Sequence, residues 1–144
     1  MKKHTKTFWA YLAGIIDGEG TISLCNLDYS QSYGTGYIGT LQVASTNKQL
    51  TEWIKKNCGG RIKIDTRKAG LNHKPGHHWI ALACDTCYIL EQVMPYLIIK
   101  KKHAKILIAY RKTVQNNRQV TVSTRKKRDS MVTQLKKLNK KGIF

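Results

Sequence analysis

Acidic residues are scarce in this chain, whose 144 residues include 8 Asp and Glu against 26 Lys and Arg. The formal net charge of +18 makes a compact domain repel itself unless a polyanion neutralises that charge. A nucleic acid does so and releases counterions as it binds, so the charge balance predicts a nucleic-acid partner. The alternatives are a surface that only keeps the protein soluble and a membrane-binding surface, although the basic segments do not form one long amphipathic helix.

Other features that would define a function class are also missing. No apolar run approaches the roughly 20 residues of a membrane span, and the basic start lacks a signal-peptide cleavage pattern. We therefore expect an intracellular protein of the cytoplasm, a nucleoid or an organelle, not a secreted one. Cys84 and Cys87 have C-x-x-C spacing, but no second close Cys or His pair completes a zinc site, so reduced thiols are expected. Without a glycine-rich phosphate loop, we expect no nucleotide cofactor.

No linker rich in Pro, Gly or Ser divides the chain, and 41% hydrophobic residues suffice for one core. We therefore expect a single domain over residues 1–144, with a basic tail at 1–6, a core over 7–112 and a basic helical extension over 113–144.

Hydrophobic periodicity predicts an α+β chain of the order helix, hairpin, helix, hairpin, helix, followed by two more helices. The predicted helices cover residues 8–16, 47–57, 85–94 and 105–114, and a last one begins at Ser123 or Thr124. The predicted hairpins pair residues 21–27 with 37–44 and residues 61–67 with 78–83. The first helix is expected to end at Gly18 and Gly20, the second to be capped by Thr46 or Asn47, and the third by Asp85 or Thr86. Pro95 then breaks the chain.

The first predicted helix is apolar on two faces. Bulky side chains form a stripe suited to a core: Phe8, Leu12, Ile15 and Ile16. Small residues form a second stripe: Ala10, Ala13, Gly14 and Gly18. Small residues spaced four apart let another backbone approach closely, so we predict that a second helix packs on this face. An ordinary buried helix is the alternative.

Two of the few acids, Asp17 and Glu19, lie together at the end of this helix. A helix C-terminus carries partial negative charge, so carboxylates there need a positive partner. A divalent cation such as Mg²⁺ supplies one, and carboxylates with metals commonly hydrolyse phosphodiesters. The alternative is that Asp17 bonds to nearby backbone and Glu19 points to solvent.

Residues 12–20, LAGIIDGEG, resemble the signature of the LAGLIDADG homing endonucleases, with Ile for Leu at the fourth place, Gly for Ala at the seventh and Glu for Asp at the eighth. Residues 41–47, LQVASTN, look like the family's second strand entering its next helix. Residues 94–104, MPYLIIKKKHA, look like its proline turn and basic stretch, so the resemblance covers about residues 8–110. It implies an αββαββα core whose antiparallel saddle sheet binds double-stranded DNA.

The resemblance also implies roles for single residues. The eighth-place acid, Glu19, is the family's metal ligand, Asp17 is more often structural, and Lys100 supports the site electrostatically. Ser45, or less directly Gln42, stands where the family orients a water; the family often has Gln there, and the shorter Ser45 needs a further water or another partner. The predicted catalytic residues are Glu19, Lys100, Ser45 and Gln42, and the predicted metal site, for Mg²⁺ or another divalent cation, comprises Glu19, Gly18 and Asp17.

Only one copy of the motif is present, so the resemblance implies a homodimer in which a second subunit supplies the second motif helix. The predicted interface residues are Ala10, Ala13, Gly14, Asp17 and Gly18. Such an interface is isologous, and each Glu19 would lie near the two-fold axis. The target is then long and roughly palindromic, and each subunit cuts one strand.

Candidate DNA contacts fall in three groups, each with a solvated surface as the alternative. The first hairpin offers Ser23, Asn26, Tyr29, Gln31, Tyr33 and Gln42. The second offers Arg61, Lys63, Asp65 and Arg67 on one alternating face, with Lys68, Lys74, His77 and Trp79 beside them. Phosphates are expected to be held by Lys101, Lys102, Arg125, Lys126, Lys127 and Arg128.

The resemblance implies an intron-encoded, site-specific endonuclease that hydrolyses both DNA strands and leaves 5′ phosphates and short 3′ overhangs. One rival is an RNA-binding intron maturase of the same family that does not cleave. A second rival is a noncatalytic basic protein of the ribosome or of chromatin, a class that has no need for the Asp17–Glu19 pair beside a small-residue face.

Overall fold

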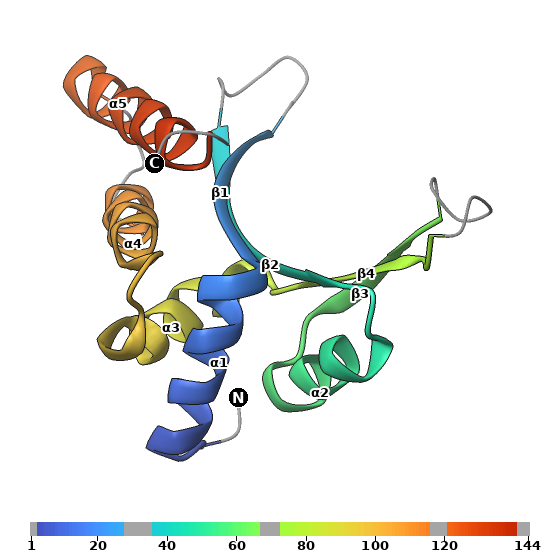
Figure 1. Ribbon diagram of the computed structural model, residues 1–144. Coiled ribbons are helices and arrows are strands. Elements are labelled where there is room, and N and C mark those ends of the chain that lie inside the picture. The colour runs from blue at the N-terminus through green and yellow to red at the C-terminus, as the bar shows by residue number, and fades with distance from the viewer. Residues whose placement is uncertain (1–2, 28–35, 67–72, 116–120, 141–144) are drawn as a thin grey trace.

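The chain runs in the order αββαββα and adds two helices at its C-terminal end, as a computed structural model describes for residues 3–27, 36–66, 73–115 and 121–140 (Figure 1). The helices are α1 (Lys6–Glu19), α2 (Lys48–Cys58), α3 (Ala83–Val93), the short 3-10 turn η1 (Met94–Tyr96), α4 (Lys101–Gln115) and α5 (Val122–Leu138). The strands are β1 (Gly20–Leu27), β2 (Gly36–Ser45), β3 (Arg61–Asp65) and β4 (Gly76–Ile80). The predicted α+β class and element order are therefore confirmed.

The four strands form one antiparallel sheet in the order β1-β2-β4-β3, so the two hairpins meet at β2 and β4. The sheet is strongly curved, and α1, α2 and α3 lie on its convex side (Figure 1). In the described part of the chain no helix covers the concave side. The concave side is therefore the one broad surface of the sheet that a ligand can reach.

Alternation along the strands decides which side chains enter the core. Those on the convex side are buried against the helices: Ile22, Leu24, Leu41, Val43 and Trp79. From the helices, Leu12, Ile16, Ile54, Ile89 and Leu90 complete the core. The Trp79 indole N–H donates to the Gly59 carbonyl over 2.8 Å, so the buried ring has a hydrogen-bond partner. Gly59 and Gly60 have φ of 71° and 84°, which lets the chain turn sharply from α2 into β3.

Several predicted boundaries are wrong, mostly at helix ends. α1 continues through Gly18 to Glu19 instead of ending after Ile16. α5 begins at Val122, because Thr121 is its cap and accepts from the Thr124 N–H over 3.2 Å. α3 begins at Ala83, and the Thr86 hydroxyl donates to the Leu82 carbonyl within the first turn instead of capping the helix.

The remaining differences concern β4 and α4. β4 spans Gly76–Ile80, earlier than predicted, and α4 begins at Lys101 instead of residue 105. The predicted Asn47 cap of α2 is confirmed, since its side chain accepts from the Gln49 N–H over 2.9 Å.

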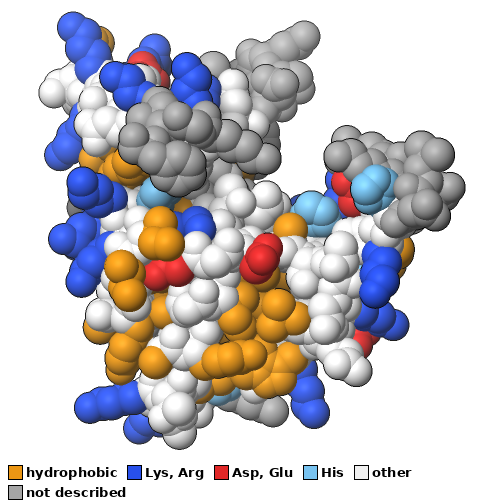
Figure 2. All heavy atoms as spheres, viewed as in Figure 1, with side chains coloured by type: hydrophobic (Ala, Val, Ile, Leu, Met, Phe, Trp, Pro, Cys, Tyr) orange, Lys and Arg blue, Asp and Glu red, His pale blue; other side chains and the backbone are white. Residues whose placement is uncertain are grey.

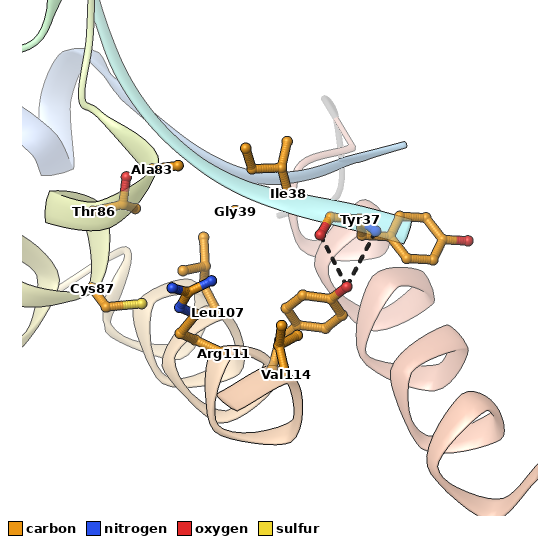
Figure 3. A pocket seen from close by; sticks show the side chains of 10 residues that line it. Tyr37, Ile38, Gly39, Ala83, Thr86, Cys87, Leu107, Arg111 and Val114 are labelled. Atoms are coloured by element: carbon orange, nitrogen blue, oxygen red, sulfur yellow. Dashed lines mark hydrogen bonds between the residues drawn. The ribbon is translucent and has the colours of Figure 1, made fainter. Parts of the chain in front are cut away.

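α4 and α5 extend the core beyond β1. The Tyr110 hydroxyl accepts from the Tyr37 N–H over 3.2 Å and donates to the Tyr37 carbonyl over 3.0 Å (Figure 3). Near the end of α5, the Asn139 amide donates to the Ile22 carbonyl over 2.8 Å. The cavity between β2, α3 and α4 in Figure 3 measures about 40 Å³, room for no more than a few waters. It therefore belongs to the packing of the core and is too small for a substrate.

None of the helices within the described ranges is long and apolar enough to cross a membrane.

Candidate active site

The candidate site begins where α1 passes directly into β1. The Gly20 N–H closes the helix by bonding to the Ile16 carbonyl. A Cβ at Gly20 would lie 2.6 Å from that carbonyl oxygen, so only glycine fits this junction. The junction fixes Glu19 as the last residue of α1, directly before β1, with its side chain exposed.

Glu19 lines a hollow of about 300 Å³ together with Ala44, Ser45, Thr46 and Gly76. The pairing of Gly20 with Val43 brings the end of β2 beside Glu19. The Ser45 hydroxyl accepts from the Asn47 N–H over 3.0 Å and still has its own proton to donate. The fold thus brings Glu19 and Ser45 to one place, whereas Gln42 lies further along the sheet, paired with Thr21 and Ile80.

Asp17 binds the backbone of the segment before α4. Its carboxylate accepts the Ile98 N–H over 2.8 Å and the Lys100 N–H over 2.9 Å. The Lys100 ammonium donates to the Asp17 carbonyl over 2.6 Å. Both carboxylate oxygens hold the segment before α4, so Asp17 has a structural role at the end of the helix, and its places in the metal site and the dimer interface stay predictions.

Two opposing influences act on the pKa of Lys100. Burial lowers the pKa of its ammonium group, while Asp17 and Glu19 act in the opposite direction. The influence of Glu19 means that the predicted catalytic lysine and the predicted metal ligand are electrostatic neighbours. The ammonium is thereby held at a place where a phosphate next to Glu19 would meet positive charge.

The oxygen donors at this end of α1 fit a hard cation. Glu19 offers an exposed carboxylate, and Gly18 is one of the last residues of the helix, whose carbonyls lack partners within it. Within the residues that the structure describes, no group of three or more His, Cys, Asp or Glu could hold a metal ion. Mg²⁺ suits so sparse a site because it keeps several waters and takes one or two carboxylates plus substrate phosphates.

The outer face of α1, formed by Ala10, Tyr11, Gly14 and Gly18, points away from the core. A Cβ placed on Gly14 or Gly18 would meet no described atom within 4 Å. Tyr11 is 58% exposed, whereas Ala13 is fully buried, so the prediction that Ala13 lies in the interface is wrong. Hydrophobic side chains gather over α1 and its neighbours on the face shown in Figure 2. The small-residue stripe is therefore open for another surface to approach.

Sequence analysis missed two apolar residues beside this face. Ile98 and Ile99 are 87% and 68% exposed on the segment that Asp17 holds. The signal in the sequence is the apolar pair directly before Lys100, within the stretch that the resemblance describes only as a proline turn and a basic segment.

The concave face of the sheet carries the side chains that alternate away from the core. On β1 and β2 these are Thr21, Ser23, Cys25, Ile38, Thr40, Gln42 and Ala44. On β4 and β3 they are His78, Ile80, Arg61, Lys63 and Asp65. Ser23 and Thr40 share a hydrogen bond of 2.7 Å between their hydroxyls. The half of the concave face formed by β1 and β2 therefore has no charged side chain at these positions, whereas the charged residues Arg61, Lys63 and Asp65 lie on β3.

Some predicted DNA contacts fall on the other side of the sheet. Trp79 is fully buried and His77 is 8% exposed, so both predictions are wrong; His78 takes the concave position between them. Asn26 alternates with Ile22 and Leu24 on the convex side. The predicted contacts Tyr29, Gln31, Tyr33, Arg67 and Lys68 lie outside the described residues. Lys74 is exposed just before β4.

Basic side chains also cover the two C-terminal helices, and they gather over α4 and α5 in Figure 2. Those exposed among the predicted phosphate contacts are Lys101, Lys102, Arg125, Lys126 and Lys127. Arg128 is different, because its guanidinium donates to the Thr113 hydroxyl over 3.0 Å and to the Thr113 carbonyl over 2.7 Å. Arg128 therefore ties α5 to α4, a structural role that we had not predicted.

Comparison with known proteins gives matches at the level of structure. No protein-family model and no curated protein sequence matches the chain. The homing endonuclease I-CvuI, in complex with the I-CreI target in the presence of Mg, matches with a TM-score of 0.74 and 19% identity over 96% of this chain and 87% of that one. The archaeal intron-encoded homing endonuclease I-Vdi141I, complexed with DNA, matches with a TM-score of 0.74 and 20% identity over 95% and 87%.

The meganuclease I-SmaMI, bound to uncleavable DNA, also has a TM-score of 0.74 with 19% identity, but the match covers 94% of this chain and 45% of that one. At these identities the matches define the fold, and the chain has the fold of homing endonucleases, as its motif resemblance implied.

Proposed function

We propose that this chain is a homing endonuclease of the LAGLIDADG type, which binds a long, roughly palindromic DNA site and hydrolyses both strands with Mg²⁺ or another divalent cation. One observation carries the proposal: Glu19 stands at the junction of a glycine-faced helix and a concave sheet, in a hollow with Ser45 and beside Lys100. The likeness to solved homing endonucleases in complex with DNA supports the same reading.

Each residue of the site has its own role in the proposed hydrolysis. The Glu19 carboxylate and the Gly18 carbonyl would hold the cation. When bound, that cation supplies an activated water and stabilises charge on the leaving 3′ oxygen. Lys100 offsets the negative charge that develops on the phosphate, and it is already fixed by its bond to the Asp17 carbonyl. Ser45 donates its hydroxyl proton to a water near the scissile phosphate, and the bond from Asn47 sets its orientation.

A homodimer completes the proposal. The outer face of α1 has room for a second backbone at Gly14 and Gly18, which brings two copies of Glu19 to a common axis. The chain spans about half the length of I-SmaMI, which has room for two such units in one chain. The concave faces of two subunits then follow the major groove on either side of the cut.

The decisive experiment uses as substrate the two DNA segments that flank the gene of this protein, joined directly to each other without the gene between them. The protein and its Glu19→Gln variant are incubated with this DNA in Mg²⁺. We expect cleavage of both strands by the unchanged protein and its loss in the variant, by at least ~1,000-fold, because a charged metal ligand is removed. DNA affinity, measured in Ca²⁺ or without metal, should stay within about twofold.

Glu52→Gln is the matched control, because this exposed glutamate on α2 pairs with Lys48 over 3.3 Å and is not among the residues that line the hollow at Glu19. It should cut like the unchanged protein. Cleavage by Glu19→Gln at the normal rate, or binding to the transcript of the gene without any DNA cleavage, would overturn the proposal, and the second outcome would favour the maturase.

A further inference from the structure

Residues 97–100, here called the coupling segment, lead from η1 to the start of α4 and combine a fixed backbone with exposed apolar side chains. Its backbone is fixed, because the Asp17 carboxylate holds the N–H groups of Ile98 and Lys100. Leu97 anchors the other end, 3% exposed, with its N–H on the Val93 carbonyl. Yet Ile98, at 87%, is the most exposed large hydrophobic residue in the described ranges, and Ile99 follows at 68%. Two isoleucines held rigidly in solvent indicate a contact surface.

A surface of matching chemistry lies on the other side of α1. A hollow of about 400 Å³ is lined by Tyr11, Asn47, Gln49, Leu50 and Trp53. Its described lining carries no charge, although the chain as a whole carries +18. A lining without cationic side chains disfavours a phosphate backbone, and the adjacent rings of Tyr11 and Trp53 give an apolar side chain a surface to pack on.

Symmetry makes the two surfaces complementary. α2 lies on one side of α1, and η1 with the start of α4 lies on the other (Figure 1). In an isologous pair built on the outer face of α1, the flank on one side of the helix meets the opposite flank of the partner. The coupling segment of each subunit then reaches the Tyr11–Trp53 hollow of the other.

The coupling segment also ends in the active site. Lys100 is its last residue, and its ammonium bonds to the Asp17 carbonyl beside Glu19. A partner that immobilises Ile98 and Ile99 therefore restrains the backbone that carries Lys100. A monomer would leave these isoleucines in water and this backbone held only from within the subunit, by Asp17 and by the Leu97 bond to the Val93 carbonyl.

We propose that dimerisation organises the active site through the coupling segment: Ile98 and Ile99 dock into the partner's uncharged hollow, and Asp17 transmits that contact to Lys100. Asp17 is then a positioning residue, and the partner copy completes the site. The inference rests on the homodimer of the proposed function, but it makes claims that require neither DNA nor cleavage.

The test compares association and backbone protection in the full-length protein without DNA. The double variant Ile98→Ser/Ile99→Ser should raise the dissociation constant of the dimer at least ~10-fold by sedimentation, because the apolar contacts of both side chains with the partner are lost. The melting temperature of the monomer should not change, since both side chains are exposed. Ile98→Val/Ile99→Val should restore association. Val122→Ser, at a 73% exposed position at the start of α5, is the matched control and should associate normally.

Hydrogen exchange tests the transmission step. In the unchanged protein, the amide of Lys100 should exchange more slowly as concentration drives association, and this dependence should vanish in the double serine variant. Asp17→Asn, which leaves one oxygen acceptor for the two amides of Ile98 and Lys100, should speed exchange in this segment and weaken association as well. Normal association of the double serine variant, or Lys100 exchange that does not respond to concentration, would overturn the inference. A protein that passes both tests and cuts no DNA would refute only the proposed endonuclease.

Discussion

The end of α1 and the concave face of the sheet adjoin each other, but they hold their side chains in opposite ways. Around α1, Asp17 and Lys100 are fixed by hydrogen bonds to backbone atoms of the other's segment. On the concave face, Arg61 and Lys63 extend from β3 as exposed side chains. Chemistry on a phosphate needs groups placed to within a fraction of an ångström, whereas reading bases needs side chains that can be exchanged without loss of the fold. The contrast predicts large, general effects at the helix and small, position-specific effects on the sheet.

After the loss of cleavage expected for Glu19→Gln, the largest effect is expected on the outer face of α1. Gly14→Leu should raise the dissociation constant of the dimer at least ~100-fold, because a bulky side chain would separate the two helices. The monomer should still fold, since the space beside Gly14 is open. Sedimentation and circular dichroism measure both effects. An intact dimer would show that this face is not the interface.

Gly14→Ala gives a sharper form of the same experiment. Alanine in a helix interior is more stable than glycine by about 1 kcal/mol, so the unfolding free energy of the monomer should rise. Association should nevertheless weaken, because the added methyl group lies on the contact surface. Opposite signs for the two quantities separate the interface role of Gly14 from any role in folding, whereas equal signs would contradict it.

The next effect distinguishes Ser45 from Gln42. Ser45→Ala should lower the rate of cleavage by about 10- to 100-fold with little change in DNA affinity, because Ser45 shares the hollow with Glu19. Gln42→Ala should change which DNA sequences are bound and leave the cleavage rate on the best site nearly constant, since Gln42 lies on the concave face. Single-turnover cleavage and binding selections measure the two quantities. If Gln42→Ala lowered the cleavage rate and Ser45→Ala did not, Gln42 would be the residue that orients the water near the scissile phosphate.

A smaller effect separates base reading from phosphate binding. Lys63→Ala should cost about 1–3 kcal/mol at one base pair of each half-site and relax the preference there. Lys126→Ala, on α5, should weaken binding to all sequences alike and lower the salt dependence of affinity by about one ion. Titrations at several salt concentrations with matched and mismatched DNA distinguish these outcomes. Uniform weakening by Lys63→Ala would place this lysine on the phosphates.

The smallest effect concerns the uncharged half of the concave face. Thr40→Val removes the hydroxyl that bonds to Ser23 and should lower the unfolding free energy by about 0.5–1.5 kcal/mol. Thermal denaturation measures it, with Thr133→Val on exposed α5 as the matched control. A loss of several kcal/mol would mean that the concave face, like the end of α1, is part of the framework.

The pattern of the strands shows why sequence analysis placed some residues and missed others. In β1 and β2, apolar residues at every second position identify the buried side, and the structure agrees for Ile22, Leu41 and Val43. In β4 the run His77-His78-Trp79 offers no such alternation. Trp79 lies on the buried side beside Val43, and the Gly59 carbonyl satisfies its indole N–H there, a partner that no local pattern reveals.

Arg128 illustrates the same limit on the surface. It belongs to a run of four basic residues, and composition treats all four alike. Only the packing of α5 on α4 brings it to Thr113, while its neighbours Lys126 and Lys127 remain exposed. A charge run therefore predicts that a phosphate-binding surface exists, but not which of its members is used for folding.

The sequence by itself determined the order of the elements, the glycine-faced first helix, the excess of positive charge and the pair of acids at the end of that helix, because each is a property of neighbouring residues. Tertiary structure alone decided which of the two acids faces the hollow. Asp17 is occupied by amides 81 and 83 positions further along the chain, and Glu19 is left facing the hollow. Two carboxylates so close in sequence acquire different tasks because the helix turns them toward different parts of the fold.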